Sequence, residues 1–194
     1  MKIIIVGGGI SGLATYLNFK KFLPESPSGE PHTITIYESH QTARDDAGNP
    51  IPEIGIGGGL GVAPNGLSEL EKLDPEIKDA VVAQGFPSHA FQMKNAWGWT
   101  LGYLRAGPSS SGTPQSMVMS RRQGIWACLK AKVPDDVLIG RRKATRVERV
   151  KEGKFTVFFA DGPTDTADIV IGADGVKSVV KQFVVGDAYP AQYE

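Results

Sequence analysis

The stretch that decides the fold is Lys2 to Gly12, KIIIVGGGISG. Residues 3–6 are apolar and β-branched, the pattern of a central parallel strand that is buried on both faces. Three glycines follow, and over residues 10–22 the apolar side chains recur at the spacing of an amphipathic helix. After a polar loop, His32 to Glu38 resumes with β-branched and aromatic residues. These patterns predict a βαβ unit with parallel, neighbouring strands and a right-handed connection.

The glycines Gly7, Gly9 and Gly12 match the spacing G-x-G-x-x-G, and each meets a separate steric demand. The first permits a tight turn, the second lets a diphosphate approach the backbone, and the third lets the helix pack closely on the strand. The helix that begins near Ile10 then points its unpaired N–H groups and the positive end of its dipole at the phosphates. Ser11 lies in its first turn and belongs to the predicted cofactor-binding set. The segment therefore predicts a dinucleotide site.

An acidic residue, Glu38, stands at the end of the second predicted strand. There a carboxylate accepts hydrogen bonds from the ribose hydroxyls of an adenosine, whereas the 2′-phosphate of NADP would meet like charge. Glu38 lies farther from Gly12 than the ~20 residues usual for this motif, and the polar loop from Pro24 to Pro31 accounts for the excess. The alternative is a solvated glutamate at a strand end.

The rest of the chain alternates helices, strands and loops. We expect a long loop that folds against a ligand over Ser39 to Gly59, a flexible tip over Gly107 to Pro114, and a surface turn over Gly186 to Pro190. Further helices are predicted to begin at Pro64 and Pro75 and to span residues 121–133 and 176–183; strands are predicted within residues 90–105, 117–120, 143–159 and 167–171. The predicted fold class is α/β, with a parallel sheet, flanking helices and a small added β-region. We expect one domain over residues 1–194, with a β-rich excursion at about 85–120.

Composition excludes several classes of function. Lys plus Arg and Asp plus Glu both number 21, so no net charge attracts nucleic acid or anionic lipid. A single cysteine, Cys128, cannot form an internal disulfide, and its helix-like surroundings indicate a buried thiol rather than a nucleophile. His32, His40 and His89 are scattered, which predicts structural or solvated roles and no metal site. No apolar run is long enough for a signal sequence or a membrane span, so we expect a cytoplasmic protein.

Four motifs together resemble the class A FAD monooxygenases, the flavin-dependent family that includes salicylate and p-hydroxybenzoate hydroxylase-like enzymes. The motifs are GGGISG with YES at Tyr37 to Ser39, GGGLGVAPNGLSELEKL from Gly57, MSRRQGIWACL around Arg122, and GADGVKS from Gly172. The resemblance implies a Rossmann-like FAD-binding domain of the glutathione-reductase type. It also implies NADPH or NADH as a transient electron donor and hydroxylation of a small organic, aromatic substrate.

The same resemblance implies roles for residues outside the first glycine turn. Gly58 and Gly59 would lie near the flavin, Arg122 would contact FAD, and Asp174 with Gly175 would form the motif shared between FAD and the nicotinamide donor. Val147 would offer its backbone to the adenine, although an ordinary strand residue is the alternative. Asp174 also has an alternative, as a helix-capping carboxylate without a ligand. Lys181 stands where the family usually ends the last motif with arginine, which weakens that part of the match.

The resemblance covers only the N-terminal half of the family, so we expect a truncated or partial chain that lacks the part closing over the flavin. No catalytic residue is assigned. Such a chain would expose apolar surface and self-associate. Two other hypotheses stay open: a dinucleotide-binding protein without turnover, and an NAD-dependent dehydrogenase domain, which would require neither Arg122 nor the late GADG motif.

Overall fold

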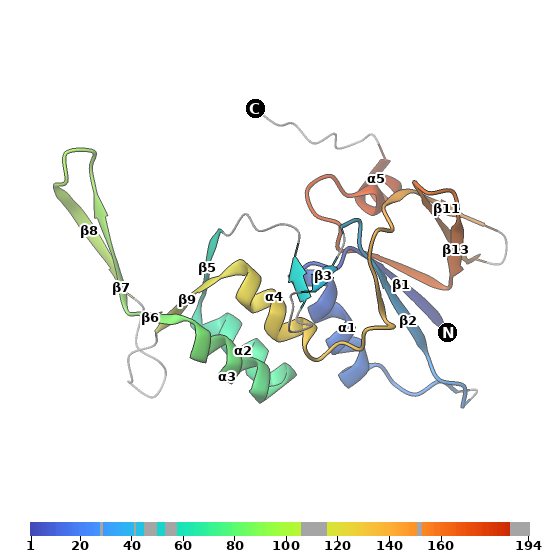
Figure 1. Cartoon of the computed structure of the whole chain (residues 1–194), viewed down its shortest axis with the longest axis horizontal. Coiled ribbons are helices and arrows are strands. Elements are labelled where there is room, and N and C mark those ends of the chain that lie inside the picture. Colours follow the sequence, from blue (N-terminus) through green and yellow to red (C-terminus); the bar gives the residue numbers. More distant parts are fainter. Residues whose placement is uncertain are drawn as a thin grey trace. The chain divides into compact units, whose positions relative to one another are not determined.

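The computed structural model describes residues 1–27, 29–40, 42–44, 50–52, 58–105, 116–150 and 153–186 (Figure 1). The chain divides into two compact units. Unit 1 comprises Met1–Gly55 and Leu129–Glu194, and unit 2 comprises Ile56–Cys128. No helix in the described ranges is long and apolar enough to cross a membrane.

A four-stranded parallel sheet forms the centre of unit 1. Its order is β10-β2-β1-β14, with β1 (Lys2–Val6) paired in parallel to both β2 (Thr33–Tyr37) and β14 (Ile169–Gly172), and β10 (Leu138–Ile139) paired to β2. The helix α1 (Ile10–Phe22) connects β1 to β2. The predicted βαβ unit and α/β fold class are confirmed.

The two faces of β1 are both buried, as its unbroken apolar run predicts. Ile3 and Ile5 are fully buried, and Ile5 lies on the face that the start of α1 covers, because a Cβ placed on Gly12 would contact the Ile5 side chain. Ile4 and Val6 belong to the core cluster on the opposite face. Alternation along a strand directs neighbouring side chains to opposite faces, so one short strand supplies both cores.

An antiparallel sheet and a short helix build the second core of unit 1. The strands β11 (Ala144–Arg149), β12 (Phe155–Phe159) and β13 (Thr164–Ala167) pair in that order, and α5 spans Val179–Val185. Side chains from all of these elements join Ile4, Val6 and Tyr37 in the cluster, among them Val147, Val157, Phe159, Ala167 and Val180.

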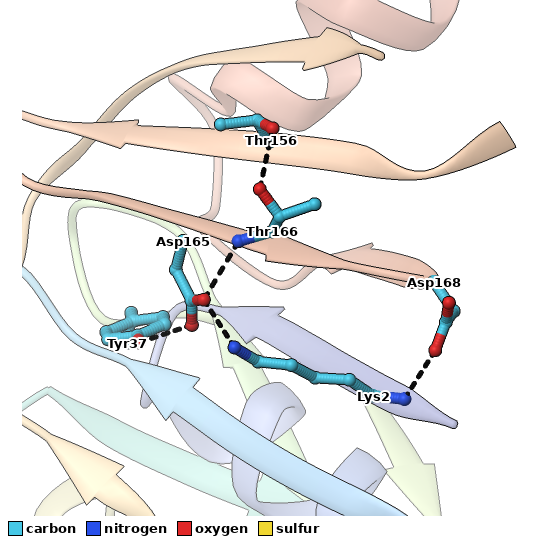
Figure 2. A network of polar contacts seen from close by, with 6 residues as sticks. All are labelled: Lys2, Tyr37, Thr156, Asp165, Thr166 and Asp168. Atoms are coloured by element: carbon cyan, nitrogen blue, oxygen red, sulfur yellow. Dashed lines mark hydrogen bonds and ion pairs between the residues drawn. The ribbon is translucent and has the colours of Figure 1, made fainter. Parts of the chain in front are cut away.

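Polar contacts connect β13 to the parallel sheet, and Figure 2 shows them at close range. Asp165 is bound by the Tyr37 hydroxyl at 2.7 Å and by the Lys2 ammonium. The Lys2 amide donates to Asp168 at 2.7 Å, just beyond the end of β13. Three strands that are distant in sequence, β1, β2 and β13, are thereby fixed to one another.

Unit 2 contains helices and antiparallel strands. Its elements are β5 (Gly59–Val62), α2 (Pro64–Leu73), α3 (Pro75–Gln84), β6 (Phe86–Ser88), β7 (Ala90–Lys94), β8 (Thr100–Arg105), β9 (Met117–Arg121) and the start of α4 (Arg122–Lys130). β5, β9 and β6 form one sheet, and β7 with β8 forms a separate hairpin. The helices predicted to begin at Pro64 and Pro75 are confirmed. Proline suits the first position of a helix, where its missing N–H costs no hydrogen bond.

The β7–β8 hairpin exposes large apolar side chains. Trp97 is 83% exposed and Trp99 is 75% exposed. Others on the hairpin are exposed as well: Phe91, Met93, Leu101, Tyr103 and Leu104. A two-stranded hairpin is at best marginally stable alone in water. Large exposed apolar patches are rare on monomeric proteins and often mark interaction surfaces.

Several predicted boundaries were wrong. The expected loop from Ser39 to Gly59 contains two short paired strands, β3 (Thr42–Arg44) and β4 (Pro50–Pro52), as well as the first residue of β5. The helix predicted over residues 121–133 ends at Lys130, before Pro134, and Val133 lies in the following turn. The tip at Gly107 to Pro114 lies outside the described residues, as does most of the turn predicted at Gly186 to Pro190.

The last predicted strand and helix also differ from the structure. The strand expected over residues 167–171 is divided, because Ala167 ends β13 and Asp168 bonds to Lys2 before β14 begins at Ile169. The helix expected from Val176 begins only at Val179, because Ser178 is its cap and accepts from the Lys181 amide at 2.8 Å.

Candidate functional site

The first glycine turn is tightly enclosed by backbone. Gly7 has φ +106° and donates its N–H to the Tyr37 carbonyl at 2.8 Å, and a Cβ there would lie 2.3 Å from the Ala173 carbonyl oxygen. A Cβ on Gly12 would lie 1.9 Å from the Gly7 carbonyl oxygen. Both positions therefore require glycine, as the motif predicts.

Gly9 lies in the opposite environment. A Cβ built there would have no atom of the described residues within 4 Å, so no part of the chain that the structure describes packs against it. Gly9 is the N-cap of α1 and no side chain of the described residues caps the helix by a hydrogen bond. Ser11 follows in the first turn and is exposed. The free N–H groups and the helix dipole at this end suit an anionic group such as a diphosphate.

Glu38 lies beside this turn and is held by several donors. Its Oε2 accepts from the Gly8 amide at 2.6 Å. Its Oε1 accepts from the Ser39 hydroxyl at 3.0 Å and from both the backbone N–H and the ring Nδ1 of His40 at 2.9 Å. Burial raises the pKa of the Glu38 carboxyl, but the bonds from His40, Gly8 and Ser39 outweigh it and hold the pKa below its usual range. Glu38 is therefore an ionised acceptor next to the turn.

Gly8 contacts the candidate acid and is a position that the motif spacing did not identify. Besides its bond to Glu38, a Cβ on Gly8 would lie 2.7 Å from Leu138 Cδ1 and 3.0 Å from Glu38 Cβ. Gly8 therefore lets the acid approach the turn. The signal in the sequence was the place of Gly8 between Gly7 and Gly9 in GGGISG.

Asp174 follows β14 and lies next to the same turn in unit 1. The preceding residue, Ala173, donates its N–H to the Val6 carbonyl at 2.7 Å and packs its own carbonyl against Gly7. The Asp174 carboxylate accepts from the Ser178 hydroxyl at 2.5 Å and from the Val179 amide at 2.7 Å. Asp174 thus binds the start of α5, whose N-cap residue is Ser178. Gly175 has φ +77° and is exposed.

The remaining candidate residues are divided between the units. In unit 2 the Gly58 carbonyl accepts from the Arg122 amide at 3.1 Å, and Gly59 pairs with Arg121 in the β5–β9 ladder. Arg122 is the first residue of α4 and is exposed. Val147 lies in unit 1, where its side chain is 5% exposed within the core cluster, as expected of an ordinary strand residue.

The cysteine and the histidines form no second site. Cys128 is half-buried, and its Sγ accepts a hydrogen bond from the side-chain amide of Gln84 at 3.2 Å. Burial raises the pKa of the Cys128 thiol, which disfavours the thiolate that a nucleophile requires. His32 contacts the Pro24 carbonyl at 2.9 Å, and His89 is exposed. Within the described ranges, no group of three His, Cys, Asp or Glu side chains could hold a metal ion.

Comparison with known proteins identifies relatives of one kind. No protein-family model matches the chain. The FAD-dependent monooxygenase pigN of Monascus ruber is 27% identical over 202 residues, which is 100% of this chain and 41% of that protein. The 3-amino-4-hydroxybenzoate 2-monooxygenase of Streptomyces cremeus is 31% identical over 139 residues, which is 70% of this chain and 34% of that protein.

A solved structure shares the fold of this chain. The structure of Klebsiella pneumoniae HpxO complexed with FAD and uric acid matches with a TM-score of 0.68 at 21% identity, over 94% of this chain and 41% of that one. This structural likeness shows the fold of the chain. The two sequence relatives are named as monooxygenases. The homologues of this chain are therefore FAD-dependent monooxygenases, and the chain spans about two fifths of their length.

Proposed function

We propose that this chain binds FAD, with the diphosphate at the Gly9 turn and the adenosine ribose at Glu38. The observation that carries the proposal is the contrast between the glycines: Gly7 and Gly12 are enclosed by backbone, whereas Gly9 faces open space at the uncapped start of α1. An internal packing role would explain the first two glycines and not the third. The names of the sequence relatives support FAD as the dinucleotide.

In this proposal the chain's own groups divide the work of binding. The first N–H groups of α1, including that of Ser11, donate to the diphosphate, and ionised Glu38 accepts from the ribose. Gly58, Gly59 and Arg122 form the flavin-side contacts, and Val147 offers its backbone to the adenine. Asp174 and Gly175 contribute at the carboxyl end of β14, where ligands of open α/β sheets gather.

We further propose that the protein containing this chain is a monooxygenase that hydroxylates a small organic, aromatic substrate with NADPH or NADH as electron donor. Bound FAD would supply the oxygen chemistry, and the protein supplies orientation and exclusion of water. Support comes from the aromatic substrate in the name of the Streptomyces relative and from the uric acid bound to HpxO.

Spectroscopy and turnover test these proposals separately. Purified protein should show flavin absorbance and release FAD on denaturation. Colourless protein that binds NAD but no FAD would instead favour a dehydrogenase domain. Oxidation of NADPH or NADH with a hydroxylated product would support the monooxygenase. Bound FAD without such turnover in the protein that contains this chain would favour a binding protein without turnover.

We also propose that the chain self-associates and that it is cytoplasmic. Self-association is supported by the apolar surface of β7–β8, where Trp97, Trp99 and Leu101 are all more than two thirds exposed. Light scattering after gel filtration should show a mass above the monomer that falls when Leu101 is replaced by Glu. A monomer at every concentration would contradict this proposal.

A further inference from the structure

The Glu38 carboxylate has little capacity left for a ligand. Its Oε1 accepts three hydrogen bonds from Ser39 and His40, and each carboxylate oxygen offers about two lone-pair sites. Among the described residues, its Oε2 accepts from the Gly8 amide alone. Oε2 is therefore the oxygen that can accept a hydrogen bond from a ribose hydroxyl. The orientation of the Glu38 carboxylate sets the direction in which Oε2 accepts.

The His40 ring has a defined hydrogen-bonding role in this cluster. Because ionised Glu38 can only accept, the Nδ1 atom of His40 carries the proton and donates to Oε1. The ring also lies 3.0 Å from the Ser39 hydroxyl, which itself donates to Oε1. The ring and the hydroxyl thus bind the same carboxylate oxygen.

The backbone on which His40 stands is fixed independently of its ring. The Glu38 amide donates to the Ile139 carbonyl at 2.9 Å, and the Arg142 amide donates to the Glu38 carbonyl at 2.8 Å. The Arg141 amide donates to the His40 carbonyl at 3.1 Å, and Arg141 adopts a φ of +58°. The His40 side chain is 55% exposed, whereas that of Glu38 is 17% exposed. Removing the ring therefore leaves the backbone bonds in place and removes little buried surface.

We propose that His40 is a positioning residue for adenosine recognition: its ring holds Glu38 Oε1 so that Oε2 accepts from a ribose hydroxyl. This inference rests on the proposed FAD site. It differs from the expectation that the acid accepts freely from both ribose hydroxyls, because one oxygen is already occupied by the chain itself. The ligand class is any nucleoside diphosphate that carries an unmodified ribose.

A comparison of two ligands separates positioning from a structural role. Titration calorimetry should measure binding of ADP and of 2′,3′-dideoxy-ADP to wild type, His40→Ala, His40→Asn and His89→Ala. We expect His40→Ala to weaken ADP binding about threefold to fivefold, the size of one half-exposed, charge-assisted bond. Binding of the dideoxy ligand should not change, since it lacks the hydroxyls that Glu38 reads. His40→Asn should restore most of the loss, and His89→Ala, an exposed histidine in unit 2, should match wild type.

The outcomes distinguish the role of His40 from the proposed FAD site on which it rests. Equal ADP affinity of wild type and His40→Ala, or equal losses for both ligands, would overturn the role of His40. Gly9→Ala serves as the reference for the site. If wild type binds no ADP, or if Gly9→Ala binds it as well as wild type, the proposed dinucleotide site itself is wrong. An unchanged melting temperature of His40→Ala would show that the fold is intact.

Discussion

Gly9 and Gly12 differ in the atoms that an added Cβ methyl group would contact. At Gly12 the nearest atom is a backbone carbonyl oxygen at 1.9 Å, which cannot move without displacing the turn. At Gly9 the backbone is extended, with φ −72° and ψ −175°, and no atom of the described residues lies within 4 Å of a Cβ placed there. Alanine therefore fits the folded protein at Gly9 and does not fit at Gly12.

This contrast gives a paired prediction. Gly12→Ala should lower the free energy of unfolding by about 3 kcal/mol, as overpacking against backbone does. Gly9→Ala should change it by less than about 0.5 kcal/mol. Chemical denaturation of both variants checks the two values. Equal destabilisation by the two substitutions would mean that the glycines serve packing alone.

Glu38 gives a prediction for pH. Its folded pKa lies below the unfolded value, so its contribution to stability is present above the unfolded pKa and is lost as pH falls through the folded pKa. Glu38→Gln should cost about 1 kcal/mol at neutral pH, because it replaces charge-assisted bonds with neutral ones. The difference from wild type should shrink in acid. Unfolding measured from neutral to acidic pH tests this, and a difference that stays constant would contradict it.

At the scale of elements, α5 depends on two side chains at its start. Asp174 accepts from the Val179 amide and the Ser178 hydroxyl, while Ser178 accepts from the Lys181 amide. Asp174→Ala should destabilise unit 1 by about 1 kcal/mol, the usual cost of losing a cap. Thermal unfolding measures this, with Asp161→Ala as a control for loss of an exposed carboxylate. If the two variants were equally stable, the capping role would be wrong.

We predict that the contact between β2 and β13 weakens at alkaline pH. Burial and the hydrogen bond to Asp165 raise the pKa of the Tyr37 hydroxyl. A raised folded pKa contributes stability that is present below the unfolded pKa and is lost as pH rises toward the folded value. Stability should therefore fall above about pH 10, the ordinary tyrosine range. Tyr37→Phe should be less stable than wild type at neutral pH and less sensitive to alkali. An unchanged alkaline slope would contradict the contact.

Elements with local signals were predicted, and those that depend on distant contacts were not. The runs at residues 3–6 and 10–22 carry their own periodicity, so β1 and α1 were found almost to the residue. In α1 the buried residues are Gly12, Leu13 and Tyr16. The break between β13 and β14 arises because Asp168 bonds to Lys2, at the other end of the chain. Spacing in one segment carries no information about such a partner.

In the candidate site, too, residues of a local motif were predicted, whereas contacts that depend on the folded chain were not. Gly7, Gly9, Gly12 and Glu38 were named from a motif, and the structure brings the glycine turn and the acid together through Gly8. The occupation of Glu38 by Ser39 and His40 could not be predicted, because it requires the chain to turn back on its own carboxylate. Whether these residues bind a cofactor stays a prediction.

At the scale of the whole molecule, the candidate residues occupy two compact units. The glycine turn, Glu38 and Asp174 lie in unit 1, whereas Gly58, Gly59 and Arg122 lie in unit 2. A ligand that binds the folded glycine turn and Glu38 stabilises the folded state of unit 1 by mass action. At 100 times its dissociation constant, FAD should raise the free energy of unfolding by about 2.7 kcal/mol. Thermal scans of unit 1 with and without FAD check this, and an unchanged transition temperature would contradict FAD binding at the glycine turn.

The most direct test of the central claim is FAD binding by wild type and by Gly9→Ala, measured by titration at matched protein concentration. The open space at Gly9 predicts one FAD per chain in wild type and a loss of at least about tenfold in affinity for Gly9→Ala, with equal unfolding temperatures of the two unliganded proteins. Equal affinities, or no FAD binding by wild type, would contradict the account.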